Sequence, residues 1–198
     1  MPSGVRDRQR DRTREALLRE GRHLFAIFGY GAVSLSQIVA ATGMTKGALY
    51  HHFDSKVDLF RAVLEQVQHE VAGRVVAAAE AGDDLWGQFT AGCQEFLAAS
   101  TAPEIQRIML IDGPAVLGWA EWRALDDAAS ARHLTQALSE LIDAGLIISQ
   151  PVVPLARLLS GAMNEAALWL AGPTRPQDIA DTRAALARLL DALRVRTH

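Results

Sequence analysis

The chain has 198 residues, 49% of them hydrophobic, a composition that supports a sizeable folded core and excludes an intrinsically disordered protein. Its single cysteine, Cys93, cannot form a disulfide within the chain, and no Cys and His cluster has metal-site spacing, so no metal or other cofactor is expected. The net charge of −3 is uneven: residues 1–56 hold 9 Lys and Arg against 5 Asp and Glu, and residues 57–198 hold 11 against 18, which indicates a first part that faces phosphate groups.

The first 14 residues are polar and rich in arginine, and they lack the apolar stretch of a secretory signal. The two most apolar windows, residues 105–119 and 152–172, are interrupted by glycine, proline or polar residues. Each falls short of the ~20 apolar residues that a membrane-spanning helix needs. We therefore expect a soluble, cytoplasmic protein that has no contact with a membrane.

Helical periodicity predicts an all-α chain, with no convincing strand pattern, internal repeat or low-complexity linker. The N-terminal helices are expected over residues 13–28, 34–42 and 45–53. Ser34 and Gln37 have the spacing of a capping box, and Gly43 marks a sharp turn. Ser55 is expected to cap a long helix over residues 56–81. Beyond it, helices are expected over residues 84–100, 103–112, 119–144, 154–171 and 176–195, with glycine and proline at the breaks.

The three N-terminal helices form a helix-turn-helix pattern, because the second and third are joined by a turn that contains glycine. Apolar side chains are spaced to meet between these helices: Leu24, Phe28, Ile38, Val39, Met44, Leu49 and Phe53. Thr45, Lys46 and Gly47 lie at the start of the third helix, where free N–H groups and the helix dipole favour a phosphate oxygen. In a helix-turn-helix this end of the helix approaches the base edges. Glycine is a poor helix former, so we interpret Gly47 as a position where the backbone comes close to DNA.

Residues 13–65 resemble the DNA-binding domain of the TetR family of transcriptional regulators. The matching pieces, in order, are T-R-E-A-L-L, L-F-A-I-F-G-Y, S-L-S-Q-I-V-A-A-T-G-M, T-K-G-A-L-Y-H-H-F and S-K-V-D-L-F. By position, the resemblance implies contacts with DNA phosphates from Ser34, Thr45, Tyr50, His52 and Lys56, and contacts in the groove from Lys46, Gly47 and His51. It also implies two domains, a helix-turn-helix domain over residues 1–56 and a larger helical domain over residues 57–198 that binds a ligand and dimerises.

Several of these residues have alternative interpretations. Tyr50 is also compatible with a core aromatic side chain, and Lys56 with an ordinary solvated charge. His51 and His52 are adjacent and diverge by about 100° on a helix, so they are poorly placed to bind one metal ion, and no metal site is expected. The arginine-rich run over residues 6–14 is interleaved with aspartates, and it is either a flexible tail or an arm that adds salt-sensitive binding to DNA.

The last two predicted helices carry apolar stripes. The first stripe contains Leu155, Leu158, Leu159, Ala162, Ala166 and Trp169, and the second contains Ile179, Leu186, Leu189, Leu190 and Leu193. One interpretation is that both helices complete the core of a monomer. The resemblance implies instead that they pair with their copies, so we expect a homodimer through residues 154–195. A two-fold dimer presents two third helices to half-sites about 34–36 Å apart on DNA.

Large apolar side chains are concentrated between the N-terminal helices and these last two helices. They are Trp86, Phe89, Cys93, Phe96, Met109, Trp119 and Trp122, and the polar candidates to orient a guest are Asn164, Gln94, Arg107, Asp112 and His133. An ordinary helical core is the alternative interpretation of each of these residues. The resemblance favours a cavity for a small molecule, and the apolar lining indicates a hydrophobic effector.

The sequence therefore predicts a regulator that binds double-stranded operator DNA, and the expected behaviour is repression that the effector relieves by a population shift. Activation is the alternative sign of regulation. Three other classes compete with this interpretation. An enzyme lacks support, because no nucleophile motif or phosphate-binding glycine loop is present. A redox-responsive regulator would sense through Cys93, and a non-specific DNA-packaging protein is disfavoured by the overall acidic charge.

Overall fold

The computed structural model describes residues 3–172 and 175–195, and across them it confirms the all-α fold expected from the sequence. Helices make up the regular structure of these residues, apart from an isolated antiparallel bridge between Ile147 and Arg194. The bridge ties the end of the chain to the loop before α10 (Val152–Trp169). Within the described residues, no helix is both long enough and apolar enough to cross a membrane.

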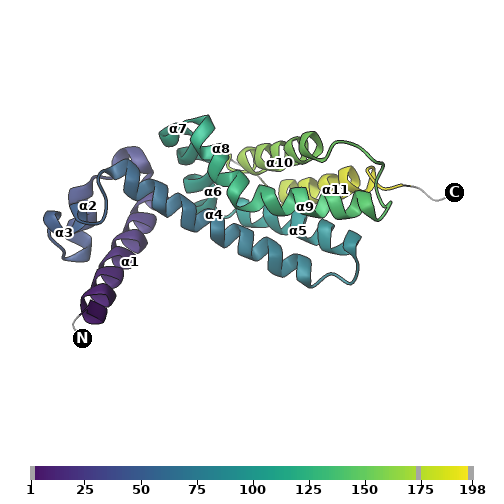
Figure 1. Cartoon of the computed structure of the whole chain (residues 1–198). Coiled ribbons are helices and arrows are strands. Elements are labelled where there is room, and N and C mark those ends of the chain that lie inside the picture. Colours follow the sequence, from purple (N-terminus) through teal and green to yellow (C-terminus); the bar gives the residue numbers. More distant parts are fainter. Residues whose placement is uncertain (1–2, 173–174, 196–198) are drawn as a thin grey trace.

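The N-terminal unit, defined here as α1 to α3, forms one end of an elongated molecule (Figure 1). In it α1 (Ser3–Phe28) packs against α2 (Leu35–Thr42) and α3 (Lys46–Tyr50), and the short 3-10 helix η1 (Tyr30–Ala32) follows α1. The long helix α4 (Lys56–Glu80) leaves this unit and runs into the larger part of the chain. Both parts of the molecule therefore share α4.

The larger part is a helical bundle built around α4. Its other helices are α5 (Leu85–Ser100), α6 (Pro103–Gln106), the π-helix η2 (Arg107–Asp112), α7 (Gly113–Leu117), α8 (Trp119–Ala128), α9 (Ser130–Asp143), α10 and α11 (Pro176–Asp191). α5 packs along α4, and α9, α10 and α11 pack against α5. Figure 1 shows the N-terminal unit at one end of this bundle and α11 towards the other.

The core of the N-terminal unit follows the apolar spacing of the sequence, with one exception. Nearly full burial is found for Leu17, Phe25, Ile38, Leu49 and Phe53, and Val39 and Met44 are partly buried against them. The predicted packing of Phe28 between the helices is wrong, because 54% of this residue is exposed. α1 ends at Phe28, and Gly29, at φ 76°, turns the chain away from the helix axis.

Two predicted helix boundaries also differ from the structure. α1 begins at Ser3 rather than at residue 13, since arginine and glutamine are good helix formers and no glycine or proline interrupts residues 5–20. The arginine-rich run therefore continues α1 instead of forming a flexible tail. The predicted helix over residues 119–144 is broken at Ala129, where φ −105° and ψ −104° separate α8 from α9. No glycine or proline marks this break, so tertiary packing rather than local propensity produces it.

The predicted helix over residues 103–112 continues further than expected. α6 leads into η2, and Gly113 and Pro114 then begin α7 instead of ending a helix. Proline is tolerated there because the N–H groups of the first turn have no hydrogen-bond acceptor within the helix, so the missing N–H of proline costs nothing. Gly113 is required because a Cβ would lie 2.9 Å from the ring of Trp122, whose indole N–H donates to the Met109 carbonyl at 2.7 Å.

Ion pairs join α1 to the bundle and also link α4 to α8 within it. Arg22 of α1 donates to Glu70 of α4 at 2.6 Å and also pairs with Glu104 of α6. Arg61 of α4 pairs with Glu121 of α8. These side chains are partly exposed, so each pair contributes little to stability, but together they fix how α1 and α4 lie against the bundle.

The turn after α1 is anchored to the π-helix. The Tyr30 N–H donates to Asp112 Oδ2 at 2.8 Å. The Arg107 guanidinium packs against Gly29, so that a Cβ at this glycine would collide with it. The turn after α1 is therefore linked directly to η2, so the bundle helps to position the N-terminal unit.

Candidate DNA-binding surface and effector cavity

α3 displays polar residues because its large apolar side chain is used in the core. Leu49 is fully buried, whereas 55% of Tyr50 is exposed, so Tyr50 is a surface residue and not a core aromatic residue. Thr45 caps the helix, since its hydroxyl accepts a hydrogen bond from the Ala48 N–H at 3.1 Å. The short helix is thus fixed from the inside and leaves its outer side free.

The residues predicted to contact the DNA groove are gathered on this outer side. Lys46, Gly47 and His51 are all exposed. Among the described residues, a Cβ at Gly47 would meet only Thr45 Oγ1, at 3.9 Å, so none of them requires a glycine there. This is the arrangement expected where a helix backbone must approach another molecule closely.

His51 and His52 follow α3, with ring centroids 5.4 Å apart and ring planes at 75°. Burial and the neighbouring His51 lower the pKa of His52, so its neutral form is favoured near pH 7. A neutral imidazole still has one N–H to donate to a phosphate. Across the described part of the chain, no group of three potential metal ligands occurs.

Ser34 and Lys56, two further residues predicted to contact phosphates, lie outside α3 in the chain. Ser34 begins α2 in the predicted capping box: its hydroxyl accepts from the Gln37 N–H at 3.3 Å, and the Ser34 N–H donates to Gln37 Oε1 at 2.7 Å. Lys56 begins α4 with its Nζ 4.0 Å from the centroid of the Tyr30 ring, and burial lowers its pKa. Lys56 is therefore held against Tyr30 in the turn after α1.

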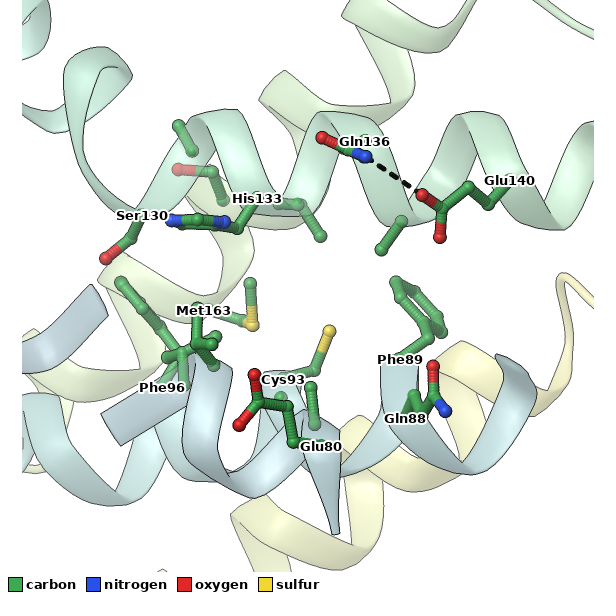
Figure 2. A pocket seen from close by; sticks show the side chains of 18 of the residues that line it. Glu80, Gln88, Phe89, Cys93, Phe96, Ser130, His133, Gln136, Glu140 and Met163 are labelled. Atoms are coloured by element: carbon green, nitrogen blue, oxygen red, sulfur yellow. Dashed lines mark hydrogen bonds between the residues drawn. The ribbon is translucent and has the colours of Figure 1, made fainter. Parts of the chain in front are cut away.

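A cavity of about 550 Å³ lies in the bundle between α4, α5, α9 and α10. Its volume falls within the ~300–1,000 Å³ typical of small-molecule sites. The larger apolar side chains in its lining are Val75, Leu85, Phe89, Phe96, Leu134 and Met163. Figure 2 shows the labelled side chains of α9 facing those of α5 across this space. The bundle therefore has an internal space of the right size for an effector.

The cavity contains part of the predicted ligand site. Phe89, Cys93 and Phe96 line it from α5, where their spacing places them on one side of the helix, and His133 lines it from α9. The predicted residues outside its lining are Trp86, Met109, Trp119, Trp122 and Asn164, together with Gln94, Arg107 and Asp112.

The side chains outside the lining have other structural roles. Trp122 is buried and bonded in the core, whereas 65% of Trp119 is exposed at the start of α8. Trp86 lies under Arg194, whose guanidinium carbon is 5.2 Å from the ring centroid. Asn164 is buried in α10. Large side chains fill cores and cover surfaces as well as cavities, and sequence spacing does not separate these uses.

Most of the lining that sequence reasoning missed comes from the end of α4 and from α9. These residues include Val75, Ala79, Glu80, Leu134, Gln136 and Glu140. α9 has a strongly amphipathic pattern, which was a usable signal. The prediction joined α8 and α9 into a single helix over residues 119–144, so the amphipathic pattern of α9 was not recognised. The break at Ala129 separates the two helices and changes the direction of the chain.

Two family profiles match this chain. Residues 17–63 match the profile described as bacterial regulatory proteins, tetR family, and residues 86–193 match the tetracyclin repressor-like, C-terminal domain. The second match alone covers more than half of the 198 residues. The chain belongs to the TetR family. The resemblance inferred from the N-terminal motifs is thus confirmed, and TetR-family proteins are DNA-binding transcriptional regulators.

Similar proteins agree with this assignment. The HTH-type transcriptional repressor Rv1474c of Mycobacterium tuberculosis is 31% identical over 134 residues, which cover 68% of this chain and 70% of that protein. A TetR-family regulator from Pectobacterium atrosepticum is 35% identical and superposes with a TM-score of 0.79 over 96% of this chain and 98% of that one. A putative TetR-family regulator from Shewanella sp. PV-4 shares the fold, with 21% identity and a TM-score of 0.74 over 93% of this chain and 99% of that one. TetR regulators bind operator DNA, usually as homodimers, and in general respond to small molecules.

In this TetR-family chain, α10 and α11 leave apolar side chains on the surface. On α10, Leu158 is 72% exposed and Trp169 is 57% exposed, and on α11, Ile179 and Leu189 are 43% and 47% exposed. The other apolar residues of these helices include Leu155, Leu159, Leu186 and Leu190, which are buried. Each helix is therefore apolar on two sides, and a single chain covers only one of them.

Proposed function

We propose that this TetR-family protein is a homodimeric repressor that a small, largely apolar molecule releases from its operator. Residues 1–56 bind DNA, and residues 57–198 sense the molecule and dimerise. The observation that carries the proposal is the cavity of about 550 Å³, because its wall includes the helix α4 that begins at the DNA-binding end.

DNA binding is assigned to the outer side of α3 and the residues that flank it. The assigned residues are Ser34, Thr45, Lys46, Gly47, Tyr50, His51, His52 and Lys56. The exposure of Lys46, Tyr50 and His51 supports this assignment, as does the absence of any neighbour that requires Gly47. Lysine supplies charge for phosphates or guanine, and tyrosine and histidine supply hydrogen bonds.

Effector binding acts on DNA affinity through α4. Val75, Ala79 and Glu80 of α4 line the cavity, and Lys56 begins the same helix beside the DNA-binding surface. A molecule that fits the cavity better in one arrangement of α4 shifts the population towards that arrangement. In a dimer, the two N-terminal units then lose the spacing of the operator half-sites. A hundredfold loss of affinity needs about 2.7 kcal/mol of coupling.

Dimerisation is assigned to residues 154–195. The exposed apolar side of α10 and α11 supports this assignment, because contiguous apolar surface on a soluble protein usually marks a contact with another molecule. A second copy of the same pair of helices covers it in a two-fold arrangement. This arrangement also supplies the second DNA-binding surface that a palindromic operator requires.

A redox response through Cys93 is the weaker candidate. Burial raises the pKa of the Cys93 thiol to about 12, so the reactive thiolate is scarce near pH 7. Cys93 also lies in the wall of the cavity beside Phe89 and Phe96. Its position fits a small apolar wall residue better than a sensor of oxidants.

The first experiment is binding of the full chain to DNA that flanks its own gene, at several salt concentrations and against scrambled DNA. We expect sequence-selective binding that weakens with salt. The double variant Lys46→Ala/Tyr50→Ala should lose the selectivity. Arg132→Ala is the matched control, because Arg132 is an exposed cation on α9, far from α3 in the sequence.

Two outcomes decide between the alternatives. Selective binding that the double variant loses and the control keeps supports the proposal and provides an assay for effectors. Binding no tighter than to scrambled DNA calls for selection from random sequences, and failure of that selection overturns the assignment of the DNA-binding surface.

A further inference from the structure

Every charged side chain in the wall of the cavity is a carboxylate. Among the described residues, Glu80, Asp126 and Glu140 line it, and no lysine or arginine does. His133 also lines it, but burial and the nearby Arg132 lower the pKa of His133, so this imidazole is mainly neutral near pH 7. The wall therefore carries three carboxylates. Asp126 is paired with Arg123, which reaches it from outside the lining, whereas Glu80 and Glu140 have no cationic partner among the described residues.

The buried end of the cavity has hydrogen-bonding capacity that the chain does not use. Asp126 and Ser130 are only 4% and 7% exposed, and both line the cavity. Arg123, which is outside the lining, donates to Asp126 Oδ2 at 2.8 Å and to the Ser160 hydroxyl at 3.2 Å. Within the described residues, Asp126 Oδ1 and the Ser130 hydroxyl have no hydrogen-bond partner. Neither atom is sealed inside the protein, so a guest in the cavity can reach both, and as unused acceptors they favour a guest that donates hydrogen bonds.

The open end of the cavity carries the other two carboxylates. Glu80, at the end of α4, and Glu140, on α9, are exposed, and Figure 2 shows them on opposite sides of the space. Gln136 donates to Glu140 at 3.0 Å, but neither carboxylate has an ion-pair partner in the described part of the chain. Unpaired carboxylates at the rim of an apolar cavity attract cations and repel anions.

The space between these two ends is apolar. Phe89 and Phe96 of α5 and Met163 of α10 form much of its wall (Figure 2). Aromatic and methionine side chains favour an apolar body, and they also tolerate a cationic group at its edge. The cavity thus combines an apolar middle with acceptors at its buried end.

We propose that the effector is an organic cation: an apolar body with a protonated amine whose N–H groups donate to Asp126 Oδ1 and the Ser130 hydroxyl. This proposal rests on the proposed function and narrows its effector from an apolar molecule to an amphipathic amine. Glu80 and Glu140 draw the cation towards the cavity from solution. A carboxylic acid of the same shape is disfavoured, because it adds an anion to a wall with three carboxylates whose one cationic partner, Arg123, is already bonded to Asp126 and Ser160.

The test compares three probes that share one apolar body: 4-butylbenzylamine, 4-butylbenzyl alcohol and 4-butylbenzoic acid. Titration calorimetry on the full chain measures their affinity, and the operator assay measures release from DNA. We expect the amine to bind about tenfold more tightly than the alcohol, because a hydrogen bond to a charged partner is worth about that factor. The acid should bind least tightly and fail to release the operator.

Variants of the buried end separate charge from shape. Asp126→Asn keeps the shape and removes the charge, so the preference for the amine over the alcohol should fall about tenfold. Ser130→Ala should reduce it by about threefold, as expected for a single neutral hydrogen bond. Asp127→Asn is the matched control: this neighbouring aspartate pairs with Arg157 outside the lining, and its loss should leave the preference unchanged. Thermal unfolding of each variant shows whether it is folded. If Asp126→Asn is not folded, the binding of the three probes to the wild type and to Ser130→Ala decides whether the proposal holds.

The outcomes distinguish this proposal from the proposed function. If the alcohol or the acid binds as tightly as the amine and releases the operator, the cation proposal is overturned and the repressor function stands. Failure of all three probes to bind also overturns it, while operator binding in the same samples reports on the repressor function separately. A preference for the amine that survives Asp126→Asn and Ser130→Ala excludes the buried end as its cause.

Discussion

The outer side of α3 and the cavity in the bundle hold their functional groups in different ways. On α3, Tyr50 and its neighbours project into solvent from a short helix that a single buried residue, Leu49, fixes to the core. In the cavity, Phe89, Asp126 and Met163 are buried side chains that come from three helices and face one shared space. A side chain lost from the displayed surface leaves the packing unchanged, whereas a large apolar side chain lost from the cavity wall changes the shape of the cavity.

This difference sets what each region can do. Exposed groups on α3 remain hydrated until they meet a partner, so their contribution depends on salt and on the shape of that partner. The buried groups of the cavity wall, such as Asp126, are already largely dehydrated, so a charge or an unpaired atom there has a larger effect on binding. Chemical modification or substitution at four positions tests this difference, and the tests follow from the largest expected effect to the smallest.

Alkylation of Cys93 tests how well the cavity is enclosed. Its pKa of about 12, against an ordinary 9.0, makes the thiolate about 10³-fold scarcer near pH 8. Iodoacetamide should therefore react with the native chain about 10³-fold more slowly than with the chain unfolded in urea, as followed by mass spectrometry. The native rate should still be rising with pH well above 9.0, where an ordinary thiol levels off.

A thiol on the displayed region is the control for that measurement. In the double variant Cys93→Ser/Ser36→Cys, the thiol replaces an exposed residue of α2 and should react at the unfolded rate in the native protein. Native Cys93 reacting as fast as this control would mean that the cavity is open to reagents.

Leu158→Glu tests the exposed side of α10. The change places a charge on a residue that is 72% exposed in one chain, and it should convert dimer to monomer in sedimentation. Operator affinity should fall about 100-fold, since the second DNA-binding surface is no longer linked to the first. Ile148→Glu alters a residue of similar exposure, 69%, outside residues 154–195, and a dimer lost in both variants would contradict the assigned interface.

Gly29→Ala tests the connection between the two regions. At φ 76° and ψ 158° an alanine is strained, and its Cβ collides with Arg107, so the free energy of unfolding in urea should fall by about 1–3 kcal/mol. Adding Arg107→Ala should restore only the part due to the collision. Gly31→Ala has no atom within 4 Å of its Cβ and should cost little, so equal losses at both glycines would argue against this explanation.

Gly47→Ala gives the smallest change and separates stability from function. The free chain has room for the methyl group, and alanine favours a helix, so stability should rise by up to ~1 kcal/mol. Affinity for the operator should nevertheless fall about tenfold, because the methyl group obstructs close approach to DNA. Urea unfolding and DNA titration measure the two effects, and unchanged affinity would show that this part of α3 does not approach the DNA.

The two regions also differ in how far the sequence predicts them. Residues 45–56 are contiguous, so their turn, caps and exposed positions follow from local rules, and the capping box at Ser34 was found in that way. The wall of the cavity extends from Val75 to Met163, and its members meet only after the bundle has folded. Periodicity shows that a helix has an apolar side but not whether a core, a cavity or a second chain covers it.

The break at Ala129 illustrates the same limit. Its local sequence favours a continuous helix, yet packing turns the chain there and brings Ser130 and His133 to the cavity. Trp119 and Trp122 were predicted as ligand residues for the same reason, since their size alone does not reveal that one is exposed and the other is bonded in the core.

The uneven burial of the tryptophans gives the protein built-in fluorescent reporters. Trp122 is 3% exposed, is bonded to Met109 of η2 and packs against Gly113, next to the Asp112 that binds the turn after α1. It should emit at short wavelength and respond to changes at η2. Trp169, 57% exposed on α10, should emit at long wavelength in a free chain and shift to the blue when a second copy covers it. In variants that keep only Trp122 or only Trp169, the emission wavelength would report separately on changes at η2 and on dimerisation.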